Sequence, residues 1–223
     1  MSVRDNQSSI SNSIESILDQ THEDFEFLIL DDFSNDETYS VIKEYEKKDE
    51  RLKIFRNKEN IGLTKSLNKL ISMTKGPLVA RQDADDISYK KRFSKQVNYF
   101  HKSKYDFCVA RAESMQHKKV IPKYSFYFPA KVVTSFKNPF IHGTLMIRRE
   151  ILLEIGSYNE RFYYAQDFKL FKDLLTQNKR FKYIKEPLYS LNMKNNISSL
   201  KKKEQKYYSD LVRKNKTPRN LIK

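Results

Sequence analysis

Cysteine is nearly absent from this chain of 223 residues, and its scarcity excludes two classes of protein. The single cysteine, Cys108, lies in the apolar stretch DFCVA. One cysteine cannot form a disulfide framework, and it cannot supply a zinc site built from several thiolates. The composition therefore favours a protein of a reducing compartment.

Long apolar runs are also missing. No segment approaches the roughly 20 apolar residues that a membrane-spanning helix requires, and the first residues lack the basic and then apolar profile of a secretion signal. The sequence therefore predicts a soluble protein of the cytoplasm, either free or peripheral at the inner face of the plasma membrane.

Acidic residues are outnumbered by basic ones. The chain has 43 lysines and arginines against 28 aspartates and glutamates, which gives a net charge of +15. Such an excess attracts anionic partners, among which are nucleic acids, phospholipid surfaces and phosphorylated small molecules. The length suits one substantial α/β domain with its own core.

Apolar spacing alternates between helical and extended periods along the first half of the chain. The pattern predicts helices over 9–20, 38–47 and 64–74, and strands over 25–30, 52–56 and 77–82. This rhythm predicts a mostly parallel sheet with right-handed crossovers, flanked by helices. Ligands of such sheets gather beyond the carboxyl ends of the strands, where Asp31, Asp32 and the sequence DADD at 83–86 fall.

The stretch LVARQDADDIS, at 78–88, packs three carboxylates into four positions. Like charges so close together are tolerated when water solvates them in a turn, or when a cation lies among them. Spacing alone leaves both interpretations open. Asp86 could instead cap the helix that contains Arg92, Phe93 and Val97.

Five separated blocks of the sequence resemble family 2 glycosyltransferases of the GT-A fold, a Rossmann-like α/β fold. In chain order they are SIESILDQTHEDFEFLILDDFSNDET, NIGLTKSLNKLI, ARQDADDIS, NPFIHGTLMIRREILLEIGSYNERF and YAQDFKLFKDLL. The resemblance covers roughly residues 1–200 and is strongest to bacterial enzymes that build lipopolysaccharide, lipooligosaccharide or capsule chains. It implies inverting transfer of a hexose from a nucleotide-diphosphate sugar, with a UDP-sugar expected, to a saccharide or lipid-linked acceptor.

For the donor, the resemblance implies a site that includes Arg4, Asp32, Asp83 and Asp85. Asp32 matches the residue that reads the base, and a carboxylate can accept the N3 proton of uracil. Asp83 and Asp85 match the DXD motif, which holds Mg²⁺ or Mn²⁺ together with the donor's phosphates. Arg4 replaces a tyrosine that stacks on the base, as a guanidinium can, although a surface arginine is the alternative.

The second half carries the residues matched to the acceptor and the chemistry. Asp167 matches a general base, worth roughly 10² to 10⁴ in rate, although spacing alone also fits a carboxylate favoured by a helix dipole. Gln166 stands where the family has glutamate. His142 matches an acceptor or diphosphate contact, with a structural histidine as the alternative. Lys194 matches a histidine near the metal or diphosphate, but only across a gap.

The resemblance divides the chain into three parts. Residues 1–112 form a nucleotide-sugar-binding half, 113–195 an acceptor-binding and catalytic half, and 196–223 a basic tail. The tail predicts either a solvated helix or a basic amphipathic helix that contacts an anionic membrane. Family members have a fuller first strand, so a truncated one is expected here. The aromatic YSFYFP at 124–129 lies where family members vary and contact the acceptor.

Two other functions stay open. The short first strand and Gln166 also fit a catalytically weak or inactive glycosyltransferase-like domain that acts as a binding partner. A nucleic-acid-binding protein is less favoured, because the basic residues are scattered or confined to the tail and the expected cleft is acidic. No nucleic-acid-binding motif is present in the sequence.

Overall fold

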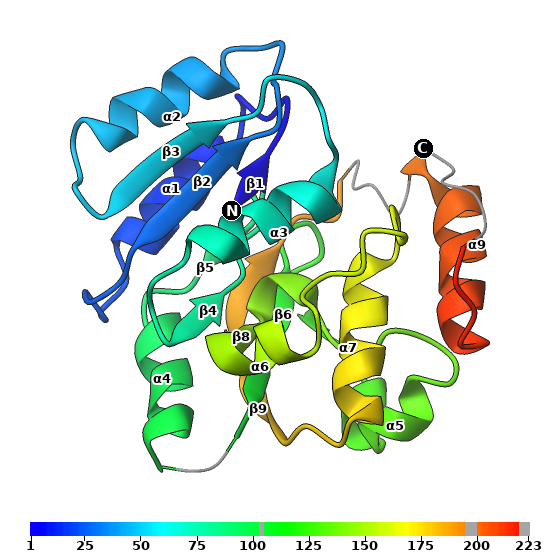
Figure 1. The fold of residues 1–223 in the computed structure, drawn as a ribbon. Helices are drawn as coiled ribbons and strands as arrows, with labels where there is room; N and C mark the ends of the chain where they lie inside the picture. Colours follow the sequence, from blue (N-terminus) through cyan, green and yellow to red (C-terminus); the bar gives the residue numbers. More distant parts are fainter. Residues whose placement is uncertain (103–104, 195–199, 219–223) are drawn as a thin grey trace.

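The first half of the fold, which ends with α3 at Met73 and is thus shorter than the half predicted over 1–112, is a small parallel sheet with helical crossovers. The structure is a computed structural model that describes residues 1–102, 105–194 and 200–218 (Figure 1). Strands β1 (Ser2–Val3), β2 (Phe27–Asp31) and β3 (Leu52–Arg56) pair in that order, all parallel. The helices of this half are α1 (Ile10–Leu18), α2 (Thr38–Glu46) and α3 (Leu63–Met73).

The second half is built on a six-stranded sheet with mixed pairing. Its path runs β4 (Leu78–Ala80), β8 (Met146–Arg148), β6 (Phe107–Ser114), β9 (Phe181–Leu191) and β5 (Ile87–Ser88), with β7 (Val120–Ile121) beside β6. Strands β6 and β9 run parallel, and the other described pairs of this sheet are antiparallel. The strand predicted over 77–82 is therefore shorter than expected, and it lies antiparallel to β8.

Helices cover this second sheet and extend the protein to one side (Figure 1). They are α4 (Arg92–Lys102), α5 (Ala130–Val133), α6 (Arg149–Glu154), α7 (Gln166–Thr176) and α9 (Lys202–Arg213), with short 3₁₀ turns η1 (Ser125–Tyr127) and η2 (His142–Thr144). Helix α9 packs against α7. None of the helices in the described residues is long and apolar enough to cross a membrane.

Apolar periodicity predicted the helices of the first half closely. Helix α1 buries Ile10, Ile14 and Ile17, which are the residues that define its apolar face, and β3 has its predicted bounds. The predicted cap was wrong: α4 begins at Arg92, too far along the chain for Asp86 to cap it. The Asp86 carboxylate instead accepts the backbone N–H of Asn192 at 2.7 Å.

The predicted tail, 196–223, lies partly outside the described residues, which omit 195–199 and 219–223. Its described part contains α9, whose Tyr208 and Val212 are buried in one cluster with Phe168 of α7 and with Phe162, which precedes α7. At least this part of the tail is therefore a packed helix with one buried face.

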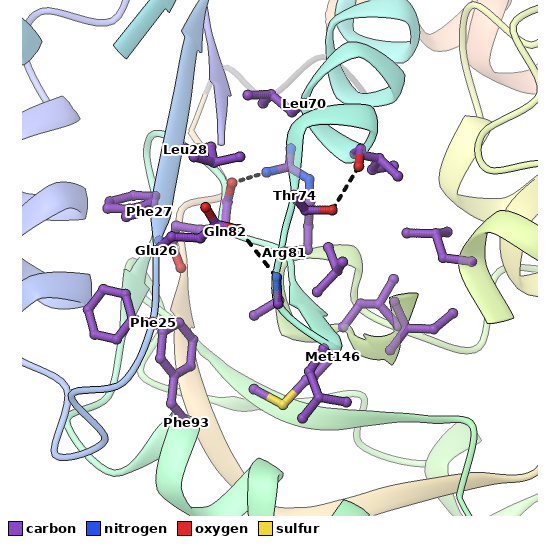
Figure 2. A pocket seen from close by; sticks show the side chains of 18 of the residues that line it. Phe25, Glu26, Phe27, Leu28, Leu70, Thr74, Arg81, Gln82, Phe93 and Met146 are labelled. Atoms are coloured by element: carbon purple, nitrogen blue, oxygen red, sulfur yellow. Dashed lines mark hydrogen bonds between the residues drawn. The ribbon is translucent and has the colours of Figure 1, made fainter. Parts of the chain in front are cut away.

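An apolar cavity of about 320 Å³ separates the two sheets. Figure 2 shows residues 25–28 on one wall, and Arg81 and Gln82, which follow β4, on the other. Leu70 of α3 and Phe93 of α4 also line it. In the described residues no strand pairing joins β2 to β4, and side chains from both halves line this space.

We expect Val212→Asp to detach α9 from the rest of the fold. Val212 is 1% exposed, and an unpaired carboxylate at that position would cost at least about 2 kcal/mol. Limited proteolysis should cleave the variant within 200–218 while the remaining chain stays folded. The matched control is Val132→Asp, because Val132 is 53% exposed; equal protease resistance of the two variants would contradict the observed packing.

Candidate active site

The acidic turn, residues 83–86, joins β4 to β5 and holds three carboxylates in different surroundings. Asp83 pairs with the guanidinium of Arg81. Asp85 is half-buried, and desolvation, followed by the charge of Asp83, raises its pKa. Asp86 is 2% exposed, and burial together with the two neighbouring carboxylates raises its pKa to about 8. A cation at this turn would relieve the repulsion that contributes to both shifts.

A buried arginine, Arg92, supports the acidic turn through hydrogen bonds. Arg92 is fully buried, and burial lowers its pKa to about 10, so it stays charged at neutral pH. It donates to side-chain oxygens of Gln82 (3.1 Å), Ser88 (2.7 Å) and Gln96 (3.0 Å), and to the carbonyl oxygens of Arg81 (2.7 Å) and Leu145 (3.4 Å). Gln82 in turn donates to the carbonyl oxygens of Asp83 and Asp86.

The oxygen donors of the acidic turn fit a hard divalent cation. Asp83 and Asp85 are the partly accessible carboxylates. Within the described residues, no group of three or more histidine, cysteine or acidic side chains is arranged to hold a metal. Mg²⁺ is commonly bound by one or two carboxylates plus substrate phosphates and water. The turn therefore suits a cation that is bound together with a diphosphate.

Asp32, predicted to read the base, anchors the loop that precedes α3. It is 3% exposed and accepts hydrogen bonds from the Asn57 side chain (2.8 Å) and from the backbone N–H groups of Ile61 (3.0 Å) and Gly62 (2.8 Å). A carboxylate has about four acceptor positions, so most of its capacity is already used. Its neighbour Asp31 is fully buried and pairs with Arg56 at 3.0 Å.

Helix α3 connects this loop to residues 157–165, which precede α7. The side-chain amide of Asn68 donates to the carbonyl oxygen of Tyr158 at 2.8 Å and accepts its N–H at 3.0 Å. Gly62 has a φ of +86°, and a Cβ there would lie 2.8 Å from the ring of Tyr163. A glycine is therefore needed where the two segments touch.

His142, at the start of η2, is paired with Tyr158. Its Nε2 is 2.6 Å from the hydroxyl of Tyr158, and the two rings meet edge to face. Desolvation, aided by the charge of Arg81, lowers the pKa of His142 to about 4, while Asp83 and Asp167 act in the opposite direction. The same three charges act on Tyr158. The His142–Tyr158 pair is therefore uncharged at neutral pH.

Asp167 lies in the first turn of α7, as predicted. The side-chain amide of Asn138 donates to its Oδ2 at 2.7 Å. Asp167 also lines a cavity of about 200 Å³ between α7, α9 and residues 137–138. Gln166 beside it is buried, and the preceding Ala165 has left-handed backbone angles, with φ 54° and ψ 27°. Asp167 is thus both oriented and open to a cavity.

Arg4 and Lys194 are not part of the network around His142. Arg4 lies beside Asp5, with 3.3 Å between their charged atoms and both side chains more than two-fifths exposed. Lys194 is exposed, and its backbone N–H donates to the side chain of Asn192 at 3.0 Å. Among the described contacts, none links either side chain to the acidic turn.

Sequence reasoning missed the contact between Tyr189 and Gly143. Tyr189, on β9, is fully buried, and its hydroxyl accepts the backbone N–H of Asp83 at 3.1 Å. A Cβ on Gly143 would lie 2.4 Å from that hydroxyl, so the glycine makes room for the tyrosine. The one available signal was a glycine directly after His142 in a chain that has only four glycines.

We expect Gly143→Ala to displace Tyr189 and loosen the acidic turn. Overpacking of this kind costs about 1 to 3 kcal/mol, which denaturant unfolding would measure. The control is Gly76→Ala, because a Cβ there meets only a carbonyl oxygen at 3.6 Å. Equal unfolding free energies for the two variants would show that the Tyr189 contact does not limit stability.

A family model and several curated proteins match this chain. Residues 1–156 match the model of Glycosyl transferase family 2. The uncharacterized glycosyltransferase MJ1057 of Methanocaldococcus jannaschii is 30% identical over 208 residues, which is 90% of this chain and 71% of that protein. The O-antigen biosynthesis glycosyltransferase WbnJ of Escherichia coli is 30% identical over 204 residues, 88% of this chain and 78% of that protein.

A third relative carries a more specific description. WfgD of Escherichia coli, a UDP-Glc:α-D-GlcNAc-diphosphoundecaprenol β-1,3-glucosyltransferase, is 28% identical over 171 residues. That alignment covers 76% of this chain and 65% of WfgD.

Solved structures share the fold. TarS 1–349 of S. aureus in complex with UDP superposes with a TM-score of 0.73 at 19% identity, over 86% of this chain and 59% of that one. The mannosyltransferase PcManGT of Pyrobaculum calidifontis, in complex with GDP-Man and Mn²⁺, gives 0.72 at 18% identity, over 97% and 64%. At these identities the likeness concerns the fold, which is of the GT-A type as expected.

Proposed function

Because the chain belongs to glycosyl transferase family 2, we propose that it transfers a hexose from a nucleotide-diphosphate sugar, a UDP-sugar in the first place, to a saccharide or lipid-linked acceptor. One observation carries the proposal. The segment 138–143 contacts groups that hold both candidate carboxylates: Asn138 donates to Asp167 at 2.7 Å, and Gly143 lies against Tyr189, whose hydroxyl accepts the backbone N–H of Asp83 at 3.1 Å. This connection supports a site in which the acidic turn binds the donor and Asp167 serves the acceptor.

On the donor side, Asp83 and Asp85 would hold Mg²⁺ or Mn²⁺ together with the diphosphate. The cation would offset the charge of the leaving nucleotide diphosphate. Asp32 would contact the base through its remaining acceptor position and keep the loop before α3 in place. The proposal also gives Arg4 a stacking role on the base, from its exposed place beside Asp5. The nucleotides and Mn²⁺ present in TarS and PcManGT are compatible with this assignment.

On the acceptor side, Asp167 would act as the general base. The acceptor hydroxyl gives its proton to the Asp167 carboxylate as its oxygen bonds to the anomeric carbon, and the bond from that carbon to the diphosphate oxygen breaks with inversion. Asn138 would orient the carboxylate through its 2.7 Å hydrogen bond. His142, which is neutral beside Tyr158, would contact the acceptor or the diphosphate. Gln166 and Lys194 would also contact the acceptor or the diphosphate.

The relatives suggest surface polysaccharide synthesis as the setting. WbnJ is described as an O-antigen biosynthesis enzyme, and the name of WfgD includes a diphosphoundecaprenol-linked acceptor. We extend to this chain a saccharide or lipid-linked acceptor of that kind at the cytoplasmic face of the membrane. The basic tail, residues 196–223, would provide peripheral contact with anionic lipid, as its positive charge favours.

We expect UDP to bind only with a divalent cation, and Asp85→Asn to weaken that binding by at least about tenfold, as loss of support for a metal does. Calorimetric titration of UDP with and without Mn²⁺ measures both effects. Asp19→Asn, at an exposed aspartate outside the acidic turn, is the control. Metal-independent binding, or an unchanged Asp85→Asn, would refute the donor site.

We expect Asp167→Asn to lower turnover of the UDP-sugar by roughly 10² to 10⁴ while UDP affinity stays unchanged. Release of UDP in the presence of acceptor is the assay. Asp173→Asn lies on the same helix, where Asp173 pairs with Lys169 at 2.6 Å, and serves as the matched control. A variant as active as the wild type would remove Asp167 from the mechanism.

A second candidate function is a glycosyltransferase-like domain that binds the nucleotide but does not turn it over. The observation in its favour is Gln166, a neutral residue in place of the family's glutamate. Binding of UDP without any turnover of UDP-sugars, in the wild-type protein supplied with lipid-linked acceptors, would support this alternative.

A further inference from the structure

Exposed aromatic side chains gather on one segment close to α5. Four rings, together with one valine, form what we call the aromatic surface: Tyr124 (68% exposed), Tyr127 (72%), Phe128 (62%), Val132 (53%) and Phe136 (70%). Large apolar side chains at this density on an exposed segment usually mark a site of interaction. None of the five lines either of the two cavities described above, so they project outward and do not enclose a small ligand.

The sequence around the aromatic surface has charge of one sign only. Between Ser114 and Arg149 there is no aspartate or glutamate. Lys123, Lys131 and Lys137 lie within or beside the aromatic surface and are exposed. Rings and lysines are thus interleaved, and no acidic residue in that stretch neutralises the charge of the lysines.

Helix α9 adds further positive charge next to this segment. Its Arg213 donates to the carbonyl oxygen of Phe136 at 2.8 Å, and Figure 1 shows α9 beside α7 and α5 at the lower end of α7. The exposed lysines on and around α9 are Lys201, Lys202, Lys203, Lys206, Lys214 and Lys216. The aromatic surface and the end of α9 are therefore in contact, and together they form one lysine-rich region, in which Glu204 and Asp210 of α9 pair with Lys201 and Arg213.

We propose that this region docks the protein on an anionic phospholipid bilayer, with the aromatic surface inserted at the level of the headgroups. Tyrosine and phenylalanine rings favour the membrane interface, and lysines nearby are attracted to anionic headgroups. A saccharide chain would instead be expected to lie in a groove with rings on its walls. The contact is distinct from that of a basic tail alone, because the rings belong to residues 124–136.

The position of this region suggests what docking would do for the enzyme. This part of the inference rests on the proposed function. Asn138, next to Lys137, donates to Asp167, and Lys137 and Arg213 line the cavity that Asp167 also lines. A bilayer held against the aromatic surface would therefore lie beside the acceptor end of the candidate site. A lipid-linked acceptor could enter there without leaving the membrane.

Co-sedimentation with vesicles tests the proposal. The wild type should bind vesicles of phosphatidylglycerol and phosphatidylcholine, and should bind phosphatidylcholine alone much more weakly. The triple variant Tyr127→Ser, Phe128→Ser, Phe136→Ser should lose at least tenfold in vesicle affinity, because three apolar side chains no longer enter the interface. The control is Leu153→Ser, at a leucine of α6 that is 42% exposed and should keep wild-type affinity.

A charge test uses two variants with the same net charge. Lys123→Glu with Lys202→Glu should weaken binding to the anionic vesicles by more than tenfold, since each lysine near the surface contributes about fivefold. Lys53→Glu with Lys58→Glu, both exposed in the first half of the chain, should bind far better than that pair. Equal vesicle affinity of the two double variants would show that only the net charge of the protein matters, and this would overturn the docking site.

Two further results would overturn the proposal. One is failure of the wild type to bind anionic vesicles, and the other is binding to a soluble acidic polysaccharide that depends on the same three rings. Vesicle binding is measured without nucleotide or acceptor, so its failure is separate from failure of the UDP titration, which tests the proposed function.

Discussion

The candidate site depends on the burial of one guanidinium, that of Arg92. A buried charge is costly unless its hydrogen-bonding groups are satisfied. The hydrogen-bond acceptors described for Arg92 are uncharged: three side-chain oxygens and two backbone carbonyls. Its guanidinium carbon also lies 5.1 Å from the centre of the Tyr189 ring. Because these partners come from the segment after β4, from β5, from α4 and from the segment before β8, this one side chain joins four parts of the second half next to the acidic turn.

Contacts with protein groups help to explain how three carboxylates can lie so close together in the acidic turn. The guanidinium of Arg81 pairs with Asp83, and Asp86 accepts an N–H from Asn192. Asp85 remains with a raised pKa and with the negative charge of Asp83 nearby. Asp86 therefore has a structural role in place of the solvated one expected, whereas Asp83 and Asp85 remain accessible and the cation among them stays a prediction. Protein groups stabilise the turn, but they leave negative charge on it. A divalent cation that also binds a diphosphate would offset this charge.

Local patterns in the sequence predicted the elements whose partners are close in the chain. The apolar face of α1, the bounds of β3 and the placement of Asp167 in the first turn of α7 all followed from spacing. The antiparallel pairing of β4 with β8 did not, because it joins residues about 70 positions apart and rests on register, which composition does not encode. The contact of Tyr189 with the N–H of Asp83 spans 106 positions and is equally invisible to periodicity.

The same distinction between local pattern and long-range contact applies to the predicted site residues. A motif can predict chemical roles for Asp83, Asp85 and Asp167, but not that His142 pairs with Tyr158 at 2.6 Å. Nor could it show that Asp32 already accepts three hydrogen bonds from the loop before α3. These properties arise from how the two halves are placed around α3, and that placement is a matter of tertiary packing.

The left-handed backbone of Ala165 has a consequence for the way α9 and α7 behave together. A residue with a Cβ in that conformation stores about 1 to 2 kcal/mol of strain, and strain persists only where the surroundings enforce it. Ala165 is buried in one cluster with Phe162, Tyr208 and Val212, and the last two belong to α9. Packing of α9 thus helps to enforce the backbone conformation of the residue just before Gln166 and Asp167. The position of the Asp167 carboxylate therefore depends in part on a helix that follows it by about 35 residues.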